Sequence, residues 1–250
     1  MKKNALILIA TLALTSCMGI FGEPGNGVSV QQAIEVGEFD SISVPSSIDV
    51  YYTQTPGEQS LTLTCDENLV DYYNIVVEER ALKVKTKPNV NVRPKAKTFL
   101  TVNSPTLSGL KLSGSGDVFT DGPIVTDGDF TISISGSGDC KANGIIQCAK
   151  FSAHTSGSGD TFLAGIVAET AGFKDTGSGD IKSTGVTAEN ISIDLSGSGD
   201  CSLECKDAGI ISVKISGSGD VTLTGNAKSL GNLSLTGSGN INVSGLSMGE

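Results

Sequence analysis

The chain has 250 residues, enough for one long domain or two small ones. Its 32 glycines, absent tryptophan and 5% aromatic residues exclude an ordinary core of large aromatic side chains, while 38% hydrophobic residues exclude a disordered chain. The net charge is −10, and residues 114–250 carry 7 Lys and Arg against 16 Asp and Glu, so we expect no nucleic acid partner.

The first predicted element is a lipoprotein signal peptide over residues 1–16. Two lysines precede the apolar run "ALILIATLAL", which rises about 15 Å as a helix and is too short to cross a bilayer of about 30 Å. The next residues, "LTSC", resemble the lipobox of bacterial lipoproteins, which implies cleavage before Cys17 and its modification by acyl chains such as palmitate. We therefore expect anchoring in the cell envelope, at the outer membrane, with the lipid as the membrane contact. An ordinary secretory signal with an incidental cysteine is the alternative.

Residues 17–34 are predicted to be the lipidated N-terminus and a flexible tether, because they contain "MGIFGEPGNG". From residue 35 the chain shows short stretches of alternating apolar residues, such as "FDSISV", "SLTLT" and "LKVKT". We assign residues 35–250 to one domain, in which residues 35–113 form irregular coils that also suit a cap. A separate β-sandwich over residues 35–113 is the alternative.

The tetrapeptide Gly-Ser-Gly-Asp recurs through residues 114–250 every 20 to 22 residues, with Asn replacing Asp in the last copy. A fixed period of this length indicates a solenoid, whose units bury their apolar faces against their neighbours. Apolar residues alternate on both sides of each tetrapeptide, which indicates short strands with one face inward. The sequence therefore predicts an all-β fold, a single-stranded right-handed parallel β-helix with coils of about 20 residues. Roughly ten such coils would form a rod.

The phrases "GEFDSISVPSSIDVYYTQ" and "LKLSGSGDV", followed by the serial "GSGD" corners, resemble the family called putative auto-transporter adhesin, head GIN domain. The resemblance covers residues 35–245. It implies a β-helical domain of secreted or lipid-anchored proteins of Gram-negative bacteria. It carries over no catalytic residue.

The acidic side chains of the tetrapeptides should form a column with neighbours about 5 Å apart. We assign this column a structural role, in which each carboxylate accepts hydrogen bonds from amides of its turn. Calcium binding is the alternative, but one carboxylate per corner falls short of the 6–8 oxygen ligands that calcium takes. We expect no metal or cofactor. The column consists of Asp117, Asp139, Asp160, Asp180, Asp200, Asp220 and Asn240.

The position two residues after each Asp should point outward. In four successive coils it holds Phe119, Lys141, Phe162 and Lys182. Phe and Lys alternating on one exposed face can stack on and hydrogen-bond a glycan, so these residues are the candidate ligand face. The alternative is a mixed face covered by a loop or another subunit.

We expect no enzyme activity. A polysaccharide-active, pectinase-like β-helix is the rival, but it needs an irregular cluster of carboxylates, whereas these acids recur identically at every corner. His154 is the single histidine, and its parity in the strand points it outward. Beyond Cys17, we interpret Cys65, Cys140, Cys148, Cys201 and Cys205 as buried thiols rather than disulfides.

Together these features predict a non-catalytic envelope lipoprotein that acts as an adhesin or as a module binding glycans or a surface protein. A purely structural spacer is the alternative. The last coil, "NINVSGLSMGE", shows no obvious cap, and an open strand edge predicts end-to-end association of two copies.

Overall fold

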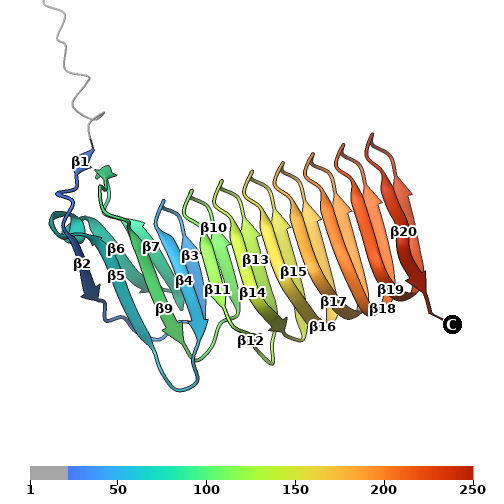
Figure 1. Cartoon of the computed structure of the whole chain (residues 1–250), viewed down its shortest axis with the longest axis horizontal. Helices are drawn as coiled ribbons and strands as arrows, with labels where there is room; N and C mark the ends of the chain where they lie inside the picture. The colour runs from blue at the N-terminus through green and yellow to red at the C-terminus, as the bar shows by residue number, and fades with distance from the viewer. Residues whose placement is uncertain (1–21, 250) are drawn as a thin grey trace, which may run out of the picture.

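The computed structural model describes residues 22–249. They form a parallel β-solenoid of about seven turns with coils of about 20 residues (Figure 1), which confirms the predicted fold class. The expected ten coils are too many, because part of the N-terminal region is not coiled. The predicted signal peptide, residues 1–16, and Cys17 lie outside the described residues.

The regular coils contain eleven strands in chain order. They are β10 (Gly109–Leu112), β11 (Val118–Asp121), β12 (Ile124–Val125), β13 (Phe130–Ile134), β14 (Cys140–Gln147), β15 (Lys150–Thr155), β16 (Thr161–Asp175), β17 (Ile181–Leu195), β18 (Cys201–Ile215), β19 (Val221–Leu235) and β20 (Ile241–Met248). The Gly-Ser-Gly-Asp corners form the row of loops along the upper edge of Figure 1. The 15-residue strands bend around the opposite corner without a break.

Each coil adds one strand segment to each of two sheets. In β16, residues 161–167 pair with β14, and residues 170–175 pair with β15. We call the sheet that contains β11, β14 and the first halves of β16–β19 the first sheet. The sheet that contains β10, β13, β15 and the second halves is the second sheet.

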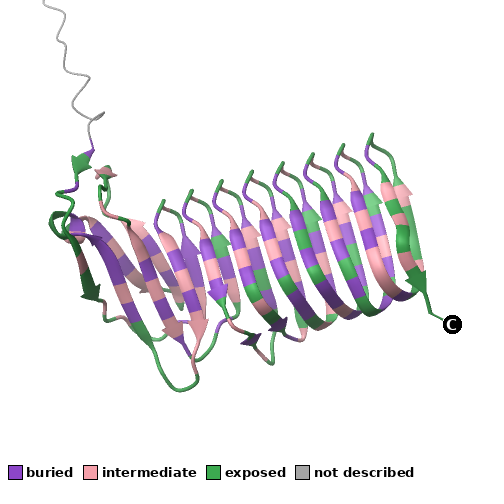
Figure 2. Ribbon diagram, viewed as in Figure 1, coloured by how far each residue is buried: buried purple, intermediate pink, exposed green. Residues whose placement is uncertain are grey.

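The core lies between the two sheets, and equivalent residues of successive coils stack on one another. Val118, Cys140, Thr161, Ile181, Cys201 and Val221 follow one another in register, and all are fully buried. Figure 2 shows the same alternation as stripes of buried and of intermediate or exposed residues along the strands of the middle coils. Period-2 patterning therefore specifies which face of each strand meets the core.

The repeated glycines are required by the close approach of successive corners. A Cβ on Gly138 would overlap the carbonyl oxygen of Gly116 in the preceding coil, and a Cβ on Gly136 would overlap that of Gly114. None of these four glycines has a positive φ. Backbone contact between coils, rather than an unusual turn conformation, therefore demands glycine at these corners.

The N-terminal region begins the solenoid with a single coil. Its strands are β3 (Ser41–Val44), which pairs in parallel with β10, and β4 (Asp49–Gln54), which pairs in parallel with β11. Residues 45–49 replace the Gly-Ser-Gly-Asp corner.

After this coil the chain folds back instead of winding on. The further elements are β1 (Glu23–Pro24), β2 (Ser29–Ala33), β5 (Ser60–Asp66), the 3-10 helix η1 (Glu67–Tyr72), β6 (Tyr73–Glu78), β7 (Ala81–Thr86), β8 (Val92–Arg93) and β9 (Phe99–Ser104). Glu79 and Arg80, both with positive φ, make the two-residue turn of an antiparallel β6–β7 hairpin. β7 and β9 extend the two sheets in parallel, but β5 runs antiparallel to β9. The expectation of irregular coils throughout residues 35–113 is therefore corrected, and because both sheets run on into the solenoid this region is not a separate sandwich either.

The expected tether over residues 17–34 is wrong from residue 23 onward. β1 pairs with β8, and β2 pairs antiparallel with β5. The backbone N–H of Gly27 donates to the buried carboxylate of Asp66 at 2.6 Å, and the N–H groups of Lys95 and Ala96 donate to the same side chain. Burial alone would raise the pKa of Asp66, but these three donors hold it below its usual value. The segment from residue 23 to residue 33 is therefore held on the domain by its strand pairings and by the hydrogen bond from Gly27 to Asp66.

The opposite end of the solenoid exposes core residues. On β19, Leu233 and Leu235 are 41% and 47% exposed, although their counterparts Val213 and Ile215 on β18 are buried. Across residues 22–249, no helix is long and apolar enough to span a bilayer.

Candidate functional site

The candidate ligand face forms one column on the outer surface of the first sheet. Phe119 on β11 pairs in register with Lys141 on β14, and Lys141 pairs with Phe162 on β16. Phe162 pairs in turn with Lys182 on β17. The structure thus brings together all four residues of this face that the sequence indicated.

Lys141 lies between two aromatic rings of the column. Its Nζ is 5.9 Å from the ring centre of Phe119 and 5.4 Å from that of Phe162. A cation at this distance from a ring is attracted to the ring's electron-rich face. These contacts hold the ammonium group along the column.

The column continues past the residues that the sequence indicated. Tyr51 on β4 stacks on Phe119, with ring centres 5.0 Å apart and planes inclined by 14°. Phe99 on β9 meets Tyr51 edge to face at 5.4 Å. Lys97 Nζ lies 5.5 Å from the centre of the Tyr51 ring and donates a hydrogen bond to its hydroxyl at 3.2 Å. We call Phe99, Tyr51, Phe119, Lys141, Phe162 and Lys182 the aromatic–lysine column.

Sequence reasoning missed Tyr51, Phe99 and Lys97. Tyr51 lies two residues after Asp49, which is the same spacing that separates Phe119 from Asp117. The corner at residues 45–49 therefore has the acidic residue that marks the outward position but lacks the glycines of the tetrapeptide. Phe99 reaches the column through pairing of β9 with β4, a contact between distant segments that no local pattern indicates.

A shallow hollow opens beside Phe162. It is lined by Lys141, Asn143, Phe162, Ala164, Lys182 and Thr184. The small side chain of Ala164 leaves room next to the Phe162 ring, while the Tyr51 and Phe119 rings stack on each other. The hollow therefore offers an aromatic surface flanked by two ammonium groups and by amide and hydroxyl groups.

The acidic column links successive coils by hydrogen bonds. The backbone N–H of Asp139 donates to Oδ1 of Asp117 at 2.8 Å, and the same bond recurs from Asp160 to Asp139 and along the column to Asn240. The sequence pointed to amides of the same turn, whereas the donors belong to the next coil. Asp49 adds one further member at the N-terminal end. Each carboxylate of this series thus has a structural partner.

Other side chains that could bind a metal ion or take part in catalysis lie away from this face. Within residues 22–249, no group of three His, Cys, Asp or Glu side chains is placed to hold a metal ion. His154 points outward from the second sheet, between Ser133 and Lys174. Burial raises the pKa of Asp175, but this carboxyl group is fully enclosed in the core, where no substrate can reach it.

The cysteines of the described region are free and buried. Cys65, Cys140, Cys148, Cys201 and Cys205 take core positions. Burial raises the pKa of the Cys140 thiol to about 12 and that of Cys205 to about 11. These thiols therefore stay protonated and unreactive at neutral pH.

Comparison with known proteins gives one family and several structures. The family described as putative auto-transporter adhesin, head GIN domain, matches residues 38–227 and, in an overlapping second match, residues 172–250. No curated protein matches the chain.

Among solved structures, the chain is similar to a putative adhesin from Bacteroides fragilis NCTC 9343, at 26% identity and a TM-score of 0.78, over 88% of this chain and 99% of that one. A putative lipid binding protein from Parabacteroides distasonis ATCC 8503 gives 26% identity and a TM-score of 0.70, over 88% and 98% of the two chains. A putative adhesin from Parabacteroides merdae ATCC 43184, at 22% identity and a TM-score of 0.66 over 87% and 98%, shows the shared fold alone. Because the family match spans nearly all of the described solenoid, the chain belongs to the putative auto-transporter adhesin, head GIN domain family.

Proposed function

We propose that the protein is a non-catalytic adhesin of the cell envelope, anchored through lipid on Cys17, which contacts glycans through the aromatic–lysine column. The observation that carries the proposal is the hollow beside Phe162, where an aromatic residue lies in register between Lys141 and Lys182 and the Lys141 ammonium group is 5.4 Å from its ring centre. Family membership supports a role at the surface or envelope. The anchor itself rests on the "LTSC" sequence at residues 14–17.

The chemistry of the hollow suits a sugar. The apolar C–H face of a pyranose packs on an aromatic ring, while its hydroxyl groups need donors and acceptors at the rim. Lys141, Lys182 and Asn143 supply such groups, and the Thr184 hydroxyl already donates to the Ala164 carbonyl at 2.9 Å, which fixes that wall. Several neighbouring positions of the column can meet successive sugars of one chain, because the strands repeat about every 4.8 Å.

Two observations favour binding over cleavage. A glycosidase acid needs a raised pKa and access to the glycosidic oxygen. Within residues 22–249, the carboxyl group with a raised pKa is that of Asp175, which is buried. The acids that face solvent along the corners are instead engaged in the bonds between coils.

The test is a glycan array followed by titration of the best neutral oligosaccharide against wild type, Phe162→Ala and Thr222→Ala. Thr222 occupies the same outward column three coils farther on and serves as the matched control. Loss of one stacked ring, worth about 1.4 kcal/mol, should weaken binding about tenfold in Phe162→Ala. Thr222→Ala should bind like wild type.

Four outcomes separate the possible roles. Tenfold weaker binding by Phe162→Ala alone supports the proposal. Absence of any glycan ligand favours a structural spacer, and turnover of the oligosaccharide by wild type favours the polysaccharide-active alternative. Equal binding by all three proteins would place the glycan elsewhere and contradict the role of the hollow.

A further inference from the structure

A shallow trough runs along the outer surface of the second sheet, on the side opposite the aromatic–lysine column. Its floor is one column of short side chains in register across successive strands. These floor residues are Ser41, Gly109, Thr131, Ser152, Gly172 and Ser192. Three depressions follow one another along this floor, one over β3, β10 and β13, and two over β15–β18.

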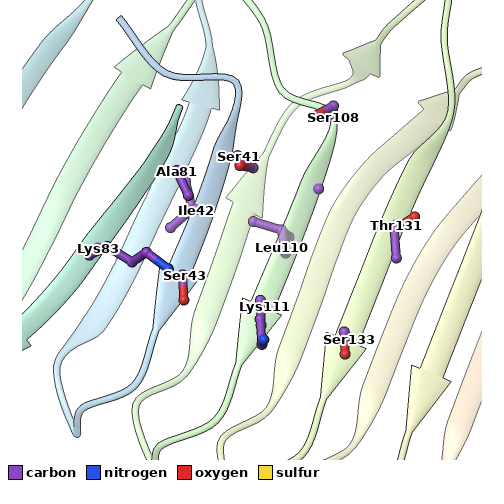
Figure 3. A pocket seen from close by; sticks show the side chains of 11 residues that line it. Ser41, Ile42, Ser43, Ala81, Lys83, Ser108, Leu110, Lys111, Thr131 and Ser133 are labelled. Carbon is purple, nitrogen blue, oxygen red and sulfur yellow. The ribbon is translucent and has the colours of Figure 1, made fainter. Parts of the chain in front are cut away.

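Lysines form one wall of the trough. In the column next to the floor, Lys83 on β7 and Lys111 on β10 flank Ser43, and both line the first depression (Figure 3). Farther along the same column lie His154, Lys174 and Lys214, with Asp194 between the two lysines. Asp194 is the single acidic residue of this column from Lys83 to Lys214, while Glu169 and Glu189 are exposed nearer the bends of β16 and β17.

This face is basic although the protein is acidic. The full chain has a net charge of −10, and six of the carboxylates of residues 114–250 lie along the Gly-Ser-Gly-Asp corners, away from the trough. A polyanion is repelled by the acidic corners and attracted to the lysines that line the trough. The hydroxyl-rich floor adds donors and acceptors for the hydroxyl groups of a sugar chain.

We propose that the trough of the second sheet is a second binding site, which takes an extended acidic polysaccharide that carries carboxylate groups. The lysines of the wall pair with carboxylates at intervals along the chain, and the short floor side chains let the polymer lie close to the sheet. A glycan chain fits this surface better than a nucleic acid does, because few cations are spread along a floor of hydroxyl groups and the Phe173 ring beneath it is buried, where a base cannot stack on it. The site is independent of the hollow beside Phe162, which lies on the other sheet.

Gly172 allows the trough to be blocked without changing its charge. A Cβ at Gly172 would meet the Ser192 hydroxyl at 3.5 Å and the Phe151 carbonyl at 3.8 Å, which are ordinary contacts. Gly172→Gln therefore places a neutral side chain across the floor while the fold is kept. Lys111→Gln combined with Lys174→Gln removes two charges of the wall, and Lys206→Gln combined with Lys228→Gln removes two exposed lysines outside the trough as a matched control.

The experiment titrates a fluorescent oligomer of galacturonic acid into the full-length protein and each variant at about 150 mM salt, where exposed charges are screened beyond about 8 Å. Wild type and Lys206→Gln/Lys228→Gln should bind alike. Gly172→Gln and Lys111→Gln/Lys174→Gln should each bind at least about tenfold more weakly, a loss of about 1.4 kcal/mol. Thermal melts of every variant confirm that it is folded.

Several results would overturn the proposal. Wild type that does not bind the uronate oligomer contradicts it, and so does a Gly172→Gln variant that is folded and binds like wild type. A single-stranded oligonucleotide of equal charge that binds as tightly would show a general electrostatic surface instead of a glycan site. Phe162→Ala should bind the uronate normally, so failure of the proposed function and failure of this site are distinguished.

Discussion

Asp175 is a buried carboxyl group whose replacement by leucine should stabilise the protein. Its side chain is fully enclosed, and Oδ2 has no hydrogen-bond partner. In the preceding coil the same inward position is Thr155, and in the following coil it is Leu195, which is also fully buried. Asp175→Leu therefore places at this corner a side chain that the next corner already accommodates.

The magnitude follows from two opposing changes. The orphaned polar atom costs about 1–3 kcal/mol, and a buried leucine contributes about 1.5–3 kcal/mol relative to an exposed one. Against this, the Gly177 N–H loses its 3.0 Å bond to Oδ1 and the Gly199 N–H loses the carboxyl group that it faces, which together cost about 1–3 kcal/mol. We expect a net gain of about 1–2 kcal/mol, or about 2–8 °C in Tm for a domain of this size.

The assay is thermal and urea unfolding followed by circular dichroism. Because a solenoid need not unfold in one step, the comparison uses Tm and urea midpoints of matched variants rather than an extrapolated free energy. Asp175→Asn keeps the polar group without its charge and should fall between wild type and Asp175→Leu. A fall in Tm for Asp175→Leu would refute the reasoning, because it would mean that the carboxyl group is satisfied by a buried partner that leucine displaces.

Four further predictions follow from the geometry. Gly138→Ala drives a methyl group into the carbonyl of Gly116 and should cost about 1–3 kcal/mol, whereas Gly172→Ala should stay within about 0.5 kcal/mol of wild type; equal urea midpoints would contradict the close approach of the corners. Burial raises the pKa of Asp175, because the buried site favours the protonated carboxyl group over the charged one. This favourable effect on stability is complete below the usual Asp pKa of about 4 and is lost as pH rises through the raised pKa of the folded protein. The Tm of wild type should therefore fall relative to that of Asp175→Asn across this pH range, and parallel pH profiles would contradict the prediction. The five buried cysteines should resist a thiol reagent in the native protein and all react after denaturation, and fewer than five of them reacting after denaturation would reveal disulfides and contradict this prediction. The exposed leucines at the C-terminal end of the solenoid predict self-association that Leu235→Lys abolishes, and a wild-type protein that sediments as a monomer at high concentration would remove this prediction.

The regular coils could be predicted from the sequence because one physical requirement repeats in every coil. Each corner presses against the carbonyl oxygens of the corner before it, so glycine recurs at a fixed spacing and reveals the register. Once the register is known, the outward column from Phe119 to Lys182 follows directly from the alternation of the strands.

The first coil was not predicted because the requirement for glycine at the corner is absent there. Its corner at residues 45–49 has no earlier corner packed against it, so Ser46 and Ile48 carry side chains where later coils need glycine. The tetrapeptide signal is therefore absent, and with it the sign that Tyr51 belongs to the column. The antiparallel strands β5 and β6 also depend on pairings between distant segments and on the turn at Glu79 and Arg80.

The trough and the buried carboxyl group needed the assembled structure. A run such as "AGFKDTGSGD" indicates that Gly172 faces outward and Asp175 faces inward, but it does not indicate which residues of other coils lie beside them. Only the stacking of coils shows that short side chains line up into a floor, and that Asp175 lies between Thr155 and Leu195. Surface chemistry of this kind belongs to columns across coils rather than to any local stretch of the chain.

Both binding faces depend on outward residues of successive coils that lie side by side, and a cross-link tests this register most directly. Ser202 and Thr222 are in-register neighbours on the first sheet, with adjacent strands about 4.8 Å apart, within the range that a disulfide spans. In a Ser202→Cys, Thr222→Cys variant, mild oxidation should form one intramolecular disulfide, detected by peptide mass mapping of the unreduced protein. A Ser202→Cys, Leu223→Cys variant should not form it, because Leu223 faces the core. Cross-linking of the second pair but not of the first would mean that the coils are out of register, and would contradict the account of both faces.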